Sequence, residues 1–151
     1  MIGLVGMSTI FSNYDIRGRL EDSMSREFVW NVGKALAEWL PQDGTVAVVS
    51  ADGASDVIIK SLIEGLRLQG RHVIDGGVGD QQTLSQINIG SKTAGGVLLS
   101  HDTLQNVEVI ALYQENDSLI TMDTGLQQII ELAESGNFVP AAIKGELTSA
   151  I

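Results

Sequence analysis

Apolar residues recur every three or four positions in several stretches of the chain, which is the spacing of one face of an α-helix. This spacing predicts a helix over residues 26–40, with Ser25 placed to act as its N-cap. The stretch "SDVIIKSLIEGLRLQG" (55–70) predicts a second amphipathic helix. A weaker pattern near 82–89 and a clearer one over 124–135 predict two further helices.

Short, almost wholly apolar stretches lie between these helices and predict buried strands. They are "TVAVVS" (45–50), "RHVID" (71–75) and "GGVLL" (95–99). A strand that is apolar on both faces is typical of a parallel sheet covered by helices on both sides. Links of a dozen or more residues, most of them helical, join these strands, so we expect parallel β-α-β crossovers.

The last third of the chain has a different pattern. "VEVIALY" (107–113) and "SLITMD" (118–123) flank a short polar segment in which Asn116 and Asp117 suit a turn. This pattern predicts an antiparallel hairpin added to the sheet. The expected fold is therefore an α/β, three-layer sandwich with a mixed, mostly parallel sheet and a C-terminal antiparallel hairpin, formed by one domain over residues 1–151.

The composition narrows the classes of function. The chain has 151 residues with a formal net charge of −10, which disfavours nucleic acid and anionic membrane surfaces as partners. There is no cysteine, so disulfides, thiolate metal sites and cysteine catalysis are excluded. The apolar N-terminal segment lacks the basic region of a signal peptide and is too short to span a bilayer, so a cytoplasmic location is expected.

Three loops follow the predicted parallel strands, where α/β proteins bind their ligands. They are "SADGASD" (50–56), "GGVGDQQT" (76–83) and "SHDT" (100–103). The second has glycines that could receive a phosphate but no P-loop lysine, so it is read either as a phosphate loop or as an ordinary tight turn. In the first, Asp52 and Gly53 suit a turn, and Ser55 suits a helix cap more than a ligand role.

The consecutive residues Ser100, His101 and Asp102 have the residue types of a hydrolase triad. Adjacent residues of an extended strand point to opposite faces, whereas a triad is assembled from separated segments, so we reject this interpretation. His72, the other histidine, is expected to be a surface or packing residue. With two histidines and no cysteine, no transition-metal site is expected from this chain; a hard cation on carboxylate oxygens has no assignable position.

Arg17, in the segment "NYDIRG", is the most interesting charged residue. Arginine suits bidentate contact with phosphate, and the following glycine gives the backbone freedom. The alternative interpretation is an ion pair with Asp15 or with a helix carboxylate.

An ordered series of motifs resembles a known family. "FSNYDIRGRL", "GKALAEWL", "VAVVSADG", "LIEGLRLQGRHVIDGG" and "AGGVLLSHD" resemble domain 1 of the α-D-phosphohexomutases, the phosphomannomutase/phosphoglucomutase family, up to about residue 147. The resemblance implies a part of a four-domain enzyme that interconverts hexose 1-phosphates and 6-phosphates through a phosphoserine. Mg²⁺ and a hexose 1,6-bisphosphate are implied as cofactors if the protein is active. In the family the metal-binding aspartates and the sugar-binding and distal-phosphate groups come from other domains, so no cofactor is expected from this chain alone.

The active-site loops depart from the family's pattern. The nucleophile loop Thr-Ala-Ser-His-Asn-Pro is represented here only by "LLSHDT". Alignment on Ser-His makes Ser100 the candidate phosphoserine and His101 its neighbour, but it needs a two-residue deletion. Ungapped alignment from the preceding glycines puts Asp102 at the phosphoserine position instead, and this is the alignment we favour. The family's Arg-Asp-Gly-Arg loop has become "SADGAS" and its Pro-Thr-Pro loop "GDQQT", which leaves Arg17 as the remaining phosphate-binding candidate.

These departures predict a phosphohexomutase-type first domain that is not a mutase by itself but a binding, regulatory or assembly module. The alternative is an active mutase part that uses Ser100 and needs further domains; a third is a sensor of small molecules through the loops at 50–56 and 76–83. Expected partners are a phosphosugar ligand, other mutase-type domains or a second copy of the chain. The tail at 140–151 resembles the start of the link to domain 2.

Overall fold

The computed structural model describes residues 9–11, 13–20 and 22–150. The strands are β1 (Thr9–Phe11), β2 (Ile16–Gly18), β3 (Val46–Ser50), β4 (Val73–Val78), β5 (Gly95–Asp102), β6 (Val107–Gln114), β7 (Ser118–Leu119) and β8 (Leu147–Ser149). The helices are α2 (Arg26–Trp39), α3 (Asp56–Leu68), α4 (Gln81–Ser91) and α5 (Gln127–Ser135), with a 3-10 turn η1 (Glu115–Asp117) and a π turn η2 (Met122–Leu126).

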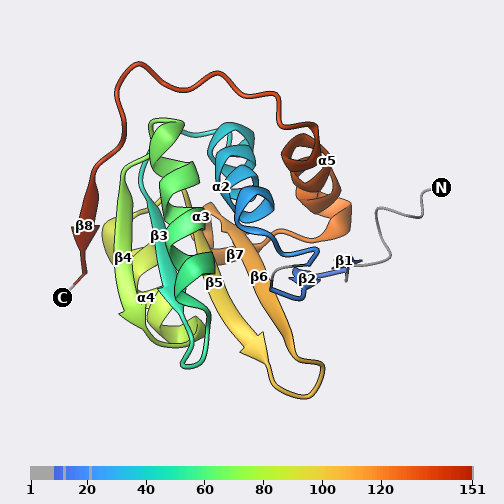
Figure 1. Cartoon of the computed structure of the whole chain (residues 1–151). Helices are drawn as coiled ribbons and strands as arrows, with labels where there is room; N and C mark the ends of the chain where they lie inside the picture. The colour runs from blue at the N-terminus through green and yellow to red at the C-terminus, as the bar shows by residue number, and fades with distance from the viewer. Residues whose placement is uncertain (1–8, 12, 21, 151) are drawn as a thin grey trace.

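The strands form one mixed sheet in the order β1-β2-β6-β5-β3-β4-β8, and β7 pairs with β6. Strands β3, β4, β5 and β8 are parallel to their neighbours in this group, whereas β1, β2, β5 and β6 form antiparallel pairs. Helices α2, α3 and α5 cover one face of the sheet and α4 the other (Figure 1). The predicted α/β sandwich with a mixed sheet and an antiparallel C-terminal hairpin is confirmed.

Strand alternation divides the apolar side chains between two cores. Val97 and Leu99 of β5 belong to the larger core, which includes residues of α2, α3 and α5. Leu98 of the same strand packs against the smaller core on the α4 side, which contains Leu84. Period-2 alternation therefore fixes which face each later residue of β5 occupies.

The predicted boundaries need one correction that matters for function. We expected the third buried strand to end at Leu99 and a loop at 100–103, but β5 continues to Asp102. Antiparallel pairing with β6 extends the strand beyond the end of β3, with Ser100 opposite Val109 and Asp102 opposite Val107. Ser100, His101 and Asp102 are thus strand residues, and the loop lies at 103–106.

Two other expectations are modified near the C-terminus. The predicted hairpin exists, but β7 is only two residues long. The predicted helix at 124–135 starts as the π turn η2, in which Gly125 has a φ of 143°, and becomes α-helical at Gln127.

The tail after α5 crosses the helices and adds a strand to the sheet (Figure 1). Its strand β8 is parallel to β4, a pairing that the sequence did not predict. The exposed His72 accepts a hydrogen bond at Nδ1 from the backbone N–H of Glu146, at 2.9 Å. No helix in the part of the chain that the structure describes is long and apolar enough to cross a membrane.

Candidate functional site

The candidate site lies at the carboxyl ends of the parallel strands. Ser50 at the end of β3 is paired with Val78 of β4 on one side and with Leu99 of β5 on the other. The three strand ends therefore meet at one edge, as the sequence predicted for the three loops. Strand β5 continues past this edge with β6, so the β5–β6 hairpin projects from the body of the molecule (Figure 1).

Arg17 on β2 is held by two carboxylates at this edge. Its Nε donates to Oδ1 of Asp15 and its Nη1 donates to Oδ2 of Asp102, both at 3.0 Å. The link to Asp102 joins β2 to the end of β5, across the intervening strand β6. From the sequence, either phosphate contact or an ion pair with Asp15 or a helix carboxylate was expected for this arginine. The structure shows the ion pair with Asp15 and a second one with Asp102, a strand residue that was not predicted as its partner.

The hydrogen bonds at this site shift the pKa of both partners. The pKa of Asp102 is lowered, chiefly because its carboxylate accepts hydrogen bonds from the backbone N–H groups of Gln105 and Leu104, and further by Arg17. The pKa of Arg17 is raised by its contacts with Asp15 and Asp102, although partial burial opposes the increase. Asp102 is therefore a stable anion at neutral pH that is shared between the arginine and the hairpin turn.

His101 lies on the other face of the sheet, because strand residues alternate. Its Nδ1 lies 2.5 Å from Oε2 of Glu108, the residue opposite it on β6. Ser100 and Asp102 lie on the α4 side, so His101 does not join them in a triad. The structure thus separates three residues that are consecutive in the sequence.

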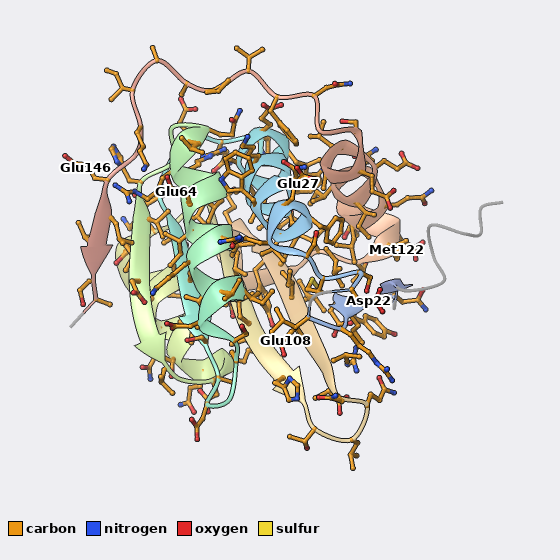
Figure 2. The ribbon with its side chains drawn as sticks, viewed as in Figure 1. Asp22, Glu27, Glu64, Glu108, Met122 and Glu146 are labelled. Atoms are coloured by element: carbon orange, nitrogen blue, oxygen red, sulfur yellow. The ribbon has the colours of Figure 1, made fainter. Side chains whose placement is uncertain are left out.

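Glu108 is a residue of the candidate site that was not singled out from the sequence. Its side chain is only 6% exposed, and its second oxygen accepts a hydrogen bond from the backbone N–H of Ser55, at 3.1 Å. In Figure 2, Glu108 lies where the β5–β6 hairpin leaves the body of the molecule. The available signal was its position: in "VEVIALY", period-2 alternation puts Glu108 on the same buried face as Ile110 and Leu112.

The two helices that begin at this edge already have carboxylates at their N-termini. Ser55 is the N-cap residue of α3, as predicted, but its side chain makes no capping hydrogen bond; its backbone N–H donates to Glu108 instead. Asp80 caps α4 by accepting from the backbone N–H of Thr83, and this lowers the pKa of Asp80. Helix N-termini attract anions, and here protein carboxylates fill both positions.

The described residues do not fit a magnesium site. Among residues 9–11, 13–20 and 22–150, no group of three or more His, Asp or Glu side chains is arranged to hold a metal ion. The two carboxylates beside Arg17, those of Asp15 and Asp102, are both paired with its guanidinium. The described residues therefore supply no set of ligands for a metal ion.

Comparisons with known proteins give one family. The family model described as phosphoglucomutase/phosphomannomutase, alpha/beta/alpha domain I, matches residues 8–139. A phosphomannomutase of Salmonella typhimurium is 31% identical over 134 residues, which are 87% of this chain and 29% of that protein. A phosphomannomutase of Klebsiella pneumoniae is 31% identical over 134 residues, and there the match covers 85% of the relative.

A solved structure agrees with these sequence matches at the level of the fold. The phosphoglucomutase/phosphomannomutase family protein from Burkholderia thailandensis superposes with a TM-score of 0.70 at 19% identity. The match covers 93% of this chain and 32% of that protein. The chain thus spans about a third of that protein and 29% of the Salmonella relative. It belongs to the phosphoglucomutase/phosphomannomutase family, in which it corresponds to the α/β/α domain I.

Proposed function

We propose that this chain is a phosphohexomutase-type first domain that does not transfer phosphoryl groups by itself and acts as a binding, regulatory or assembly module. The observation that carries the proposal is the ion pair between Arg17 and Asp102. In a domain that used Arg17 to hold a phosphate, the guanidinium would have to be available to an anionic ligand. Here its charge is balanced by Asp102 and Asp15.

The other anion-receiving positions support the same proposal. Glu108 occupies the N-terminus of α3, and Asp80 occupies that of α4. The segments 50–56, 76–83 and 103–106 contain no Lys or Arg. A sugar bisphosphate brings several negative charges, and a surface lined by carboxylates without compensating cations would repel it.

One observation favours the alternative of an active mutase part. Ser100 is opposite Val109 of β6, and Val109 is also opposite Arg17 of β2, so the serine and the arginine lie in one row on the same face of the sheet. Neighbouring strands are about 4.8 Å apart. An arginine two strands away could therefore reach a phosphate on Ser100 if it released Asp102. In that reaction the sugar-phosphate P–O bond would break as a new P–O bond forms to Oγ of Ser100, and the sugar oxygen would leave as a hydroxyl by taking up the proton that the serine gives up.

Phosphoryl transfer to the chain separates the two functions. The protein is incubated with glucose 1,6-bisphosphate and magnesium, and its intact mass is measured before and after. We expect no phosphoryl group to be added. Stable labelling at Ser100 that disappears in Ser100→Ala would overturn the proposal and establish the active alternative.

A second variant tests the role of Asp102. In Asp102→Ser the hydroxyl stands at the position given by the ungapped alignment and Arg17 loses one of its two carboxylates, so this variant is the one most able to accept a phosphoryl group. Asp102→Asn is the matched control, since it removes the same charge without adding a hydroxyl.

A thermal shift with glucose 1-phosphate or glucose 6-phosphate in the native chain, without labelling, would instead indicate a sensor of sugar phosphates.

A further inference from the structure

Three exposed apolar side chains lie at the carboxyl edge of the sheet. Leu104, at the tip of the β5–β6 hairpin, is 96% exposed, Val78 at the end of β4 is 73% exposed, and Val57 at the start of α3 is 43% exposed. Single exposed apolar residues are normal on a protein surface. These three lie at or just after the ends of β5, β4 and β3 at the carboxyl edge, so this side of the molecule offers apolar contacts to a partner.

The same segments carry negative charge. Asp52, Asp56 and Asp80 are exposed on them, and no Lys or Arg occurs between residues 50 and 57, 76 and 83 or 102 and 106. Lys60, on the second turn of α3, is 3.4 Å from Asp56. Asp52 and Asp80 therefore face solvent without a basic residue in their own segments.

The edge is also held in shape before any partner arrives. Oδ1 of Asp102 accepts the backbone N–H groups of Leu104 and Gln105, which fixes the turn at the tip of the hairpin. Glu108 ties the base of the hairpin to the N-terminus of α3. A preformed surface loses little conformational entropy on binding, which favours recognition of a partner.

We propose that this carboxyl edge docks a basic segment of another protein, one that carries apolar side chains between its Lys or Arg residues. This inference rests on the proposed function as a binding module, and names the chemistry of the partner. Complementary charge selects a basic partner, and the exposed Val57, Val78 and Leu104 select one with apolar side chains.

The charge at this edge also favours a basic protein segment over a second copy of the chain or nucleic acid. A second copy of the chain carries a net charge of −10 and would present the same acidic edge, so self-association here is opposed by repulsion. Nucleic acid is disfavoured for the same reason. A small cation would satisfy the aspartates but would leave the apolar side chains exposed.

The geometry sets the length of the segment. Strand β5 runs three residues beyond Leu99, which is its last residue paired with β3. At about 3.3 Å per residue, the hairpin projects roughly 10 Å past the ends of β3 and β4 before its turn begins. An extended segment of about six residues is therefore long enough to contact both the loops and the side of the hairpin.

The test uses the full chain and a synthetic peptide of about eight alternating Lys and Leu residues. Binding is followed by amide chemical shifts in NMR spectra, and we expect them to change at 52–57, 78–80 and 103–106. A Lys and Gly peptide, which lacks apolar side chains, should bind at least several-fold more weakly. A Glu and Leu peptide should not bind.

Matched variants distinguish binding at this edge from a general attraction of the basic peptide to an acidic protein. The double variant Asp52→Asn with Asp80→Asn should weaken binding about three- to tenfold, as expected for two partly screened charge contacts. Asparagine also caps helices well, so α4 should be retained. The double variant Glu131→Gln with Glu134→Gln removes the same charge from α5 and should leave binding unchanged.

A second pair of variants tests the apolar contribution. Leu104→Ser should weaken binding several-fold, whereas Ile89→Ser, at an exposed position on α4, should not. Equal losses in the edge variants and their controls, or shift changes spread over the surface, would overturn the inference. Absence of peptide binding without labelling at Ser100 removes only this inference, whereas labelling at Ser100 removes the proposed function.

Discussion

Replacing Arg71 with methionine removes the side chain that closes the C-terminal end of α2. The guanidinium is buried and donates five hydrogen bonds to backbone carbonyls. Nε and Nη2 reach the carbonyl of Ala37 at 3.0 and 2.8 Å, and Nη2 also reaches that of Leu40 at 3.1 Å. Nη1 reaches the carbonyls of Gln42 and Gly44 at 2.7 and 3.1 Å. These carbonyls belong to the end of α2 and to the turn that leads into β3.

The size of the effect follows from these contacts. A hydrogen bond from a charged donor contributes about 1.5–3 kcal/mol. Five such bonds cannot simply be added, because they share one guanidinium whose burial is itself unfavourable and lowers its pKa. Methionine keeps the apolar stem but leaves four carbonyls without their donor. We expect Arg71→Met to lower the free energy of unfolding by about 3–5 kcal/mol.

Thermal and urea unfolding followed by circular dichroism measure this loss. For a domain of this length, 1 kcal/mol corresponds to about 2–4 °C in Tm, so Tm should fall by roughly 6–20 °C. Arg71→Lys keeps the charge but not the planar fork, and should recover less than half of the loss. Arg26→Met, at an exposed arginine, should change stability by less than about 0.5 kcal/mol. A loss below about 1 kcal/mol for Arg71→Met would refute the argument that this side chain holds the end of α2.

Three further predictions concern the backbone, an exposed carboxylate and the candidate site. Gly125→Ala should lower the free energy of unfolding in urea by about 2–4 kcal/mol, because φ is 143° and the new Cβ would lie 2.1 Å from a tryptophan ring atom of α2. Gly90→Ala is the control: a Cβ there would have no atom within 4 Å, and the variant should be stabilised by about 0.5–1 kcal/mol. Burial and a neighbouring glutamate raise the pKa of Glu134, so the charged form is disfavoured in the folded state at neutral pH. Glu134→Gln should therefore raise the free energy of unfolding by a few tenths of a kcal/mol at pH 7. This gain should vanish once the pH falls below the pKa of the unfolded state, about 4.3. Arg17→Leu should raise the pKa of Asp102 in an NMR titration, but not to its ordinary value, because the two backbone N–H groups remain; an unchanged pKa would contradict the ion pair.

The sequence predicted the central part of the fold because burial on both faces leaves a direct signal. The apolar runs at 45–50 and 95–99 correspond to β3 and β5, and the periodic stretches at 26–40 and 55–70 correspond to α2 and α3. The short strands β1 and β2 at one side of the sheet and β8 at the other were not predicted. Strand β8 has three exposed residues and β2 has three residues in all, too few for a period-2 pattern to be distinguished.

The sequence predicted that the candidate site lies at the carboxyl ends of the strands, but only some of the contacts between its residues. Arg17 and Asp102 were both selected from the sequence, but 85 positions separate them, and only the pairing of β2 and β5 with β6 brings them together. Glu108 was missed because its partners come from two other segments, one of them 53 positions away. Local patterns identify strands and caps, whereas the register between distant strands decides which charges meet.

The carboxylates at the edge, two at helix N-termini and one beside Arg17, have physical reasons that are independent of any ligand. A parallel α/β fold places helix N-termini, with their unsatisfied N–H groups, beside the carboxyl ends of its strands. These N–H groups favour a nearby anion whether or not the protein has a phosphate to bind. Glu108 and Asp80 satisfy the donors at α3 and α4, and Asp102 satisfies Arg17. In a domain of this fold that receives no phosphate, internal anions at these positions therefore stabilise the edge, and each one also makes the edge more acidic and more suited to a basic partner.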